Sequence, residues 1–220
     1  MTEWTILWEG RGLILSGLWL TLWIFALSSV GAFLVGCLLL YGMESGGLPA
    51  RLLRGFVDGM RALPFLILAY LLYYGLPQLG LRLSAVSAGL LAMTIYHGAY
   101  FAEILRGARL VLPSGTVEAA KAYGFLPRTT FLRIVLPQLL LRTRPMIGNQ
   151  LIYALKDTSF LAIITVQELT AAANALQAQY FIPTQAFVVV IALYWAITVC
   201  LELAVRKAGA FGIQRGFENV

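Results

Sequence analysis

Long apolar segments constrain this chain more than any other feature of its sequence. Residues 13–41 run without a single acidic or basic side chain, and about 20 apolar residues are enough to cross a bilayer core as a helix. The chain as a whole is 60% hydrophobic and 12% charged, whereas a soluble domain carries roughly twice that share of charge. Because backbone polar groups in lipid must be bonded within the segment, these segments predict α-helices.

The pattern predicts an all-α integral membrane protein with five transmembrane helices in a single domain, residues 1–220. The spans are expected at about residues 13–41, 56–75, 84–105, 146–166 and 185–205. Glycine and proline clusters separate most of these spans. The exception is a long polar connection, residues 106–145, between the third and fourth spans.

Basic residues gather on one side of the predicted spans. They are Arg51 and Arg54 after the first span, Arg106, Arg109, Lys121, Arg128, Arg133, Arg142 and Arg144 in the 106–145 loop, and Arg206, Lys207 and Arg215 in the tail. The other side has only Arg11 and Arg82. Because basic loops stay in the cytoplasm, the N-terminus is expected outside and the C-terminus and the 106–145 loop inside. The net charge of +6 then reflects these loops and predicts no nucleic-acid partner.

Within the 106–145 loop, residues 117–123 are expected to form a short helix. Thr116 can cap its N-terminus, and Glu118 lies in its first turn, where the helix dipole favours an acid. Gly124 is placed to end the helix because it tolerates a positive φ.

Pro127 suits the first turn of a second helix, which Pro137 should kink or stop. The two pieces together predict a helix–turn–helix bracket on the cytoplasmic face. The alternative is an ordinary amphipathic helix that rests on lipid headgroups.

The same segment resembles the EAA loop of ABC-importer permeases, in which Glu-Ala-Ala, Gly and Ile-x-Leu-Pro recur at set spacings. Every one of those positions is met, by Glu118, Ala119, Ala120, Gly124, Ile134, Leu136 and Pro137. The resemblance implies a type I importer permease fold and a coupling helix that docks on an ATP-binding subunit. By this resemblance Glu118 is the docking acid, Ala119 and Ala120 belong to the coupling helix and Gly124 forms its bend.

The resemblance covers nearly the whole chain and narrows to the polar amino-acid group of permeases. Gly17-x-x-x-Thr21-Leu22 is similar to that group's first-span motif, and Leu155-Lys156-Asp157-Thr158-Ser159-Phe160 resembles its fourth-span motif. The segment that begins at Arg61 is similar to Arg-Gly-Thr-Pro-Leu-Leu but departs from it at Ala62, Leu63 and Phe65. Thr116 stands where glutamine is usual.

Ionisable residues at bilayer depth are costly and therefore mark candidate functional sites. Lys156, Asp157, Thr158 and Ser159 in the fourth span are candidates for lining a substrate pathway, since an acid and hydroxyls suit the ammonium of an amino acid. Alternatively, Lys156 and Asp157 only stabilise a helix break. Arg61 is a gating candidate that could instead snorkel to the headgroups.

No catalytic or metal-binding set is found in the sequence. It has no Gly-x4-Gly-Lys-Ser/Thr phosphate loop, and His97 is its one histidine, expected as a polar packing residue. Cys37 and Cys200 both lie in apolar runs and are expected as buried packing residues. The chain is therefore expected to be a non-catalytic subunit without a cofactor or metal of its own.

The favoured hypothesis is the permease subunit of an ATP-driven importer of polar amino acids in the bacterial inner membrane, with basic amino acids as an option suggested by Asp157. The resemblance implies a second permease subunit, identical or related, two ATP-binding subunits that hold ATP and Mg²⁺, an extracytoplasmic amino-acid-binding protein, and membrane lipid. Two alternatives stay open: the same kind of importer for another small polar solute, and a membrane scaffold that docks a cytoplasmic partner without transport.

Overall fold

The computed structural model describes the backbone of residues 2–214 and the side chains of residues 2–207, which form helices and connections without any strand. The α-helices are α1 (Glu3–Glu9), α2 (Arg11–Met43), α3 (Gly47–Ala62), α4 (Phe65–Tyr70), α5 (Ala85–Leu110), α6 (Gly115–Ala122), α7 (Pro127–Thr130), α8 (Leu136–Asp157), α9 (Leu169–Tyr180) and α10 (Pro183–Gln214). Two π-helical turns, η1 (Leu71–Gly75) and η3 (Phe131–Val135), and two 3₁₀ segments, η2 (Leu76–Leu79) and η4 (Thr158–Ile164), extend them. The expected all-helical fold is confirmed.

Within the described part of the chain, three helices are long and apolar enough to cross a bilayer alone: α2, α5 and α10. Two bent helix pairs are further candidates for spans, α3 with α4 to η2 at 102°, and α7 to η4 with α9 at 47°. Counting each bent pair once gives five crossings. Only 6% of the apolar window of α10 is buried within the chain, so this helix requires lipid or another subunit around it.

Pro64 divides the second expected span, residues 56–75, into two helices. Leu63 is extended, with φ −84° and ψ 142°, because the proline ring disfavours helical geometry in the residue before it. Pro64 also lacks the N–H that would continue the ladder of α3. The helix before the break begins at Gly47, earlier than expected, so the break redirects the chain near the end of a long amphipathic helix.

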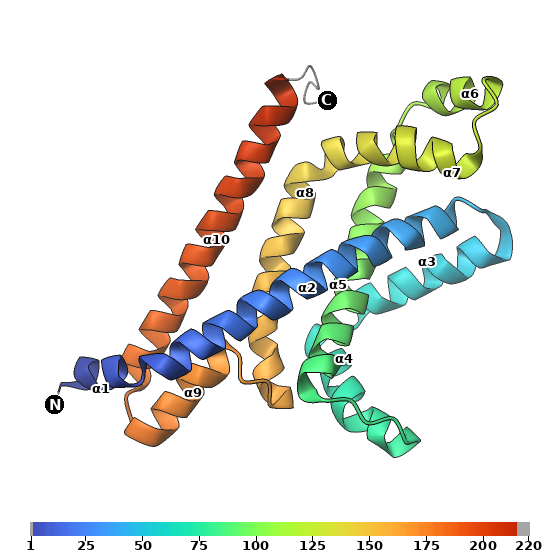
Figure 1. Ribbon diagram of the computed structural model, residues 1–220. Coiled ribbons are helices and arrows are strands. Elements are labelled where there is room, and N and C mark those ends of the chain that lie inside the picture. Colours follow the sequence, from blue (N-terminus) through green and yellow to red (C-terminus); the bar gives the residue numbers. More distant parts are fainter. Residues whose placement is uncertain (1, 215–220) are drawn as a thin grey trace.

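The helix that begins at Pro127 continues through Pro137 instead of stopping there. The proline removes one regular hydrogen bond, and the wider π turn of η3 immediately before it absorbs the displaced carbonyl. Helix α8 therefore joins the bracket to the helical bundle without a break in the helix. Pro145 lies inside α8, whose ribbon bends in Figure 1, as expected where a proline interrupts the ladder.

Helices α2 and α5 form the centre of the fold by packing at close range through small residues. Gly36 lies so close to Phe101 that an added Cβ would come within 2.6 Å of the Phe101 Cβ. Gly98 meets Val35 in the same way, at 2.8 Å. Small residues at membrane helix crossings allow such contact because van der Waals packing, more than the hydrophobic effect, joins helices in lipid.

Figure 1 shows the two ends of the molecule. Helices α6 and α7 lie at the same end as the C-terminal part of α10, whereas α1 and α9 lie at the opposite end. Helix α1 is attached to α10 through buried Leu7 and a hydrogen bond from Gln185 to Glu3. The bracket and the N-terminal helix are therefore separated by the length of the helical bundle.

Candidate coupling surface and intramembrane polar site

The bracket, residues 115–137, is folded by a glycine-terminated helix followed by a proline-started one. Gly124 has φ +75°, and its N–H donates to the carbonyl of Lys121 at 3.0 Å. The Phe125 N–H donates to the carbonyl of Ala120, also at 3.0 Å. These two bonds form a Schellman motif, which satisfies the last carbonyls of α6. Pro127 then opens α7 at its first turn, so the predicted helix–turn–helix is confirmed.

The prediction that Thr116 caps α6 is wrong. The helix begins two residues earlier than expected, at Gly115, because the N–H groups of Val117 and Glu118 both donate to the carbonyl of Ser114 at 2.9 Å. Thr116 lies inside the first turn, where its hydroxyl contacts the carbonyl of Pro113 at 3.5 Å. The earlier start leaves Glu118 within the first turn, as expected.

The coupling residues expected from the sequence occupy different environments in the bracket. Glu118 and Ala119 are exposed, whereas Ala120 is buried with 4% of its surface accessible. Two large side chains beside the bend are also exposed: Tyr123 at 84% and Leu126 at 71%. Sequence reasoning missed them, although an aromatic and a leucine flanking a glycine in a polar loop were a visible signal.

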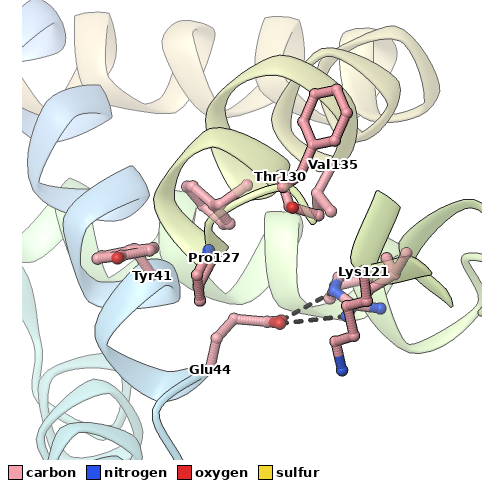
Figure 2. Close-up of a pocket in the computed structure, with 10 residues that line it drawn as sticks. Tyr41, Glu44, Lys121, Pro127, Thr130 and Val135 are labelled. Atoms are coloured by element: carbon pink, nitrogen blue, oxygen red, sulfur yellow. Dashed lines mark hydrogen bonds and ion pairs between the residues drawn. The ribbon is translucent and has the colours of Figure 1, made fainter. Parts of the chain in front are cut away.

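A cavity of about 300 Å³ lies between the bracket and the end of α2. Figure 2 shows Tyr41 and Glu44 on the α2 side of this cavity, with Lys121, Pro127 and Thr130 on the bracket side. The carboxylate of Glu44 pairs with the guanidinium of Arg109 at 2.8 and 3.1 Å, which ties the end of α2 to the end of α5.

Aromatic packing also joins the bracket to the bundle. The ring of Tyr41 packs against that of Phe131 with centroids 5.0 Å apart, and Phe131 belongs to a buried cluster with Leu40 and Leu105. Phe131 therefore gives the bracket apolar contacts with both α2 and α5.

Arg61, the gating candidate, lies at the end of α3 immediately before the Pro64 break. Its guanidinium is 3.4 Å from Glu103 and 3.9 Å from Asp58, and lies 5.7 Å from the centroid of the Tyr100 ring. The Glu103 carboxylate also accepts two hydrogen bonds from Arg106, at 2.6 and 2.7 Å. Asp58 lies on α3 with Arg61, but the shorter contact crosses to α5, so Arg61 links the bent α3–α4 pair to the central helix.

The four pathway candidates lie where α8 changes into the 3₁₀ segment η4. Lys156 is exposed and the side chain of Asp157 is 21% accessible. Thr158 is fully buried, and its hydroxyl donates to the carbonyl of Leu155 at 2.6 Å. Ser159 donates to the carbonyl of Lys156 at 2.7 Å. Both hydroxyls thus bond to the backbone at the helix transition, which leaves Asp157 as the accessible carboxylate of the set.

Asp157 faces the central helix α5 rather than Arg61. Its Oδ2 lies 3.5 Å from Nε2 of His97, a side chain that is itself 2% exposed. The other ring nitrogen of His97 bonds Nε2 of Gln150 at 2.8 Å. The rings of Phe65 and Tyr96 pack against the imidazole at 6.0 and 5.4 Å between centroids. The structure therefore joins Asp157 to His97, which the sequence had marked only as a packing residue.

Another carboxylate, Glu168, is buried and went unnoticed in the sequence. It is fully buried and caps α9, accepting hydrogen bonds from the N–H groups of Thr170 and Ala171 at 2.8 Å each. The Tyr194 hydroxyl of α10 donates to the same carboxylate at 2.9 Å. An acid followed by a threonine and an alanine run was a possible sign of a capped helix. Glu168 joins α9 to α10 and is fully engaged in that structural role.

The described residues contain no group of three or more histidine, cysteine, aspartate or glutamate side chains placed to hold a metal ion. Cys37 is partly buried, whereas Cys200 is exposed on α10. The expectation that both cysteines are buried is therefore wrong for Cys200, because the apolar face of α10 that carries it is not covered by this chain.

Comparison with known proteins shows which family has this sequence and this architecture. Residues 31–207 match the family described as the inner membrane component of binding-protein-dependent transport systems. The glutamine transport system permease protein GlnP of Escherichia coli strain K12 is 32% identical over 208 residues, which cover 93% of this chain and 95% of that protein. The probable glutamine ABC transporter permease protein GlnM of Bacillus subtilis strain 168 is 28% identical over 203 residues, covering 92% and 94%.

Among solved structures, the crystal structure of an amino acid ABC transporter with histidines superposes with a TM-score of 0.82 and 25% identity, over 93% of this chain and 96% of that chain. The sequence match and the shared fold extend over the same helices that carry the bracket and the intramembrane carboxylate. The chain therefore belongs to the family of inner membrane components of binding-protein-dependent transport systems, the permease subunits of ABC importers.

Proposed function

We propose that this chain is the permease subunit of an importer of polar amino acids, driven by ATP-binding subunits that dock on the bracket. The observation that carries this proposal is the bent, exposed bracket with Tyr123 and Leu126 at its tip. Large apolar side chains that project from a polar segment mark an interaction surface. The relatives supply the substrate class, since they are glutamine and other amino-acid permeases.

The bracket faces the cytoplasm in this proposal, and the N-terminus lies outside. Two observations support this orientation. The basic residues concentrate in and around the 106–145 loop, and basic loops remain inside. The bracket lies at the same end of the molecule as the C-terminal part of α10 and opposite α1 (Figure 1).

Each coupling residue has a distinct role in the proposed docking. Glu118 offers an exposed carboxylate, and Ala119 presents a small surface that permits close approach of a partner backbone. Tyr123 and Leu126 supply apolar contact area. Ala120 is buried and positions α6 from within, whereas Gly124 sets the angle between α6 and α7 through its positive φ.

Five crossings are few to enclose a pathway, so two permease subunits, identical or related, pair in the proposed complex. Two ATP-binding subunits sit under the two brackets, and an extracytoplasmic binding protein delivers the substrate. The nearly uncovered apolar length of α10 supports burial against lipid and a second subunit. Transport follows from alternating access, which requires the partners to bind the two conformations with different affinity.

Asp157 is proposed to meet the substrate, because its carboxylate is partly accessible and lies beside His97, which packs in an aromatic cluster with Phe65 and Phe160. The ammonium of an amino acid is attracted both by a carboxylate and by aromatic faces. Lys156, the exposed residue immediately before Asp157, offers a cation for a substrate carboxylate. Thr158 and Ser159 serve the helix transition instead. Arg61 is proposed as a gate, since it links the bent second crossing to α5.

Photocrosslinking tests the docking proposal. Benzophenone-alanine at position 123 in the assembled complex should crosslink to the ATP-binding subunit, and the matched position 195, where Trp195 is 70% exposed on α10, should not. Crosslinking from position 123 to lipid alone would show that the bracket rests on headgroups and would overturn the proposal.

A further inference from the structure

The one histidine of the chain bridges two turns of α8 from the central helix α5. Gln150 and Asp157 are seven positions apart on α8, so they lie on nearly the same face. His97 contacts Gln150 through Nδ1 at 2.8 Å and approaches Asp157 through Nε2 at 3.5 Å. Both His97 and Gln150 are buried, with 1% and 7% of their surface accessible. A purely apolar packing position would need none of these polar contacts.

The two partners require the same imidazole tautomer. The amide nitrogen of Gln150 can only donate a hydrogen bond, so Nδ1 of a neutral ring accepts it and the ring proton lies on Nε2. The carboxylate of Asp157 can only accept, and it lies on the Nε2 side. One neutral tautomer therefore satisfies both neighbours, and the opposite tautomer satisfies neither.

The Nε2–H of His97 has no other partner. It is buried and without a hydrogen bond among the described residues, and 3.5 Å from Asp157 Oδ2 is longer than a formed hydrogen bond. A buried donor left unpaired is costly, so a small rotation of the Asp157 side chain toward His97 is favoured. The imidazole cannot move as easily, because Phe65 and Tyr96 pack against its faces and edge.

Close packing makes α5 a rigid support for this contact. Gly98, the residue after His97, lies within 2.8 Å of Val35 on α2 when a Cβ is added, and neighbouring Ala99, Phe101 and Ala102 are fully buried. A donor on such a helix has a fixed position, whereas Asp157 lies where α8 gives way to η4. The fixed imidazole can therefore orient the neighbouring carboxylate.

We propose that His97 is a positioning residue for Asp157: its Nε2–H, held in place by Gln150, orients the carboxylate toward the substrate pathway. This inference rests on the proposed pathway role of Asp157. It adds that a neutral hydrogen-bond donor, and not a packing residue, is required at position 97. It also predicts that Gln150 acts through the imidazole without contacting the substrate.

The test compares two variants of His97, each of which places an amide nitrogen at the position of a different ring nitrogen. In His97→Gln the amide nitrogen reaches about as far as Nε2 and keeps the donor to Asp157. In His97→Asn the shorter amide reaches only the place of Nδ1 and loses that donor. The readout is the number of amino-acid molecules transported per ATP hydrolysed by the whole complex in proteoliposomes, with saturating loaded binding protein. General loss of folding lowers the amount of complex but not this ratio.

We expect the ratio to fall about five- to tenfold in His97→Asn, the loss of one hydrogen bond to a charged group, and to remain within about twofold of wild type in His97→Gln. Adding His97→Asn to Asp157→Asn should change nothing further, because residues that act through one another are not additive. If His97→Asn fails to assemble, Gln150→Met, which removes the amide donor at similar volume, should lower the ratio in the same direction.

Three results would overturn the inference. Equal ratios in His97→Gln and His97→Asn would show that the Nε2 donor is not needed. An effect of His97→Asn that adds fully to that of Asp157→Asn would show an independent role and leave the pathway role of Asp157 intact. An unchanged ratio in Asp157→Asn would instead remove the pathway role from the proposed function, and the positioning role with it.

Discussion

Replacing Gly124 by alanine isolates the bend of the bracket from every other property of the loop. Gly124 has φ +75°, and no heavy atom lies within 4 Å of the Cβ that alanine would add. The substitution therefore introduces no clash and removes no side chain. Its whole effect is on the backbone conformation that joins α6 to α7.

The magnitude follows from the left-handed geometry. An L-residue other than glycine pays about 1–2 kcal/mol in this region, and a difference of that size changes a population by about 5- to 30-fold. The Schellman bonds of Gly124 and Phe125 hold the bend but cannot lower that cost. The bracket of Gly124→Ala should therefore populate the docking geometry less, and its affinity for the ATP-binding subunit should fall by about 5- to 30-fold.

The assay is titration of purified ATP-binding subunit onto the permease in nanodiscs, with Gly115→Ala as the matched control. Gly115 also has open space around it but no positive φ, so alanine there should bind as wild type does. Gly124→Asn should fall between the two, because asparagine enters the left-handed region more readily. Wild-type affinity in Gly124→Ala, or equal losses in the alanine and asparagine variants, would refute the reasoning.

Three further outcomes are expected. Glu118→Ala should weaken docking about five- to tenfold, the loss of one charge-assisted contact; unchanged assembly and unchanged substrate-stimulated ATP turnover would refute its role. Gly36→Ala should lower the melting temperature by about 2–10 °C, because the added Cβ would lie 2.6 Å from Phe101 and overpack the contact between α2 and α5. The control Gly59→Ala has open space around it and should melt as wild type does. Tyr194→Phe removes a donor from buried Glu168 and should cost about 1–3 kcal/mol, measured as a lower melting temperature without loss of docking.

The sequence predicted the helical class, the bracket and its bend because each depends on local rules. Apolar length identifies a helix in lipid, and a glycine followed three residues later by a proline identifies the end of one helix and the start of the next. Gly124 and Pro127 occupy the expected positions. Pro64 carried an equally local signal for the break in the second crossing, but the apolar residues on both sides of it concealed that signal.

The contacts between polar residues of different helices could not be predicted from local sequence rules. His97 and Asp157 are distant in sequence, and only the crossing of α5 with α8 brings them together. Glu168 meets Tyr194 for a similar reason, through the packing of α9 on α10. Apolar patterning on a membrane helix gives weak information on which face meets which neighbour, because lipid and protein contacts are equally apolar.

The most direct test of the account is ATP turnover by the whole complex in nanodiscs, with its binding protein and a panel of basic, acidic and neutral amino acids. The account predicts that one class of amino acid stimulates turnover and that Gly124→Ala weakens this stimulation without changing the turnover of the isolated ATP-binding subunits. No stimulation by any amino acid, with all subunits present and assembled, would contradict it.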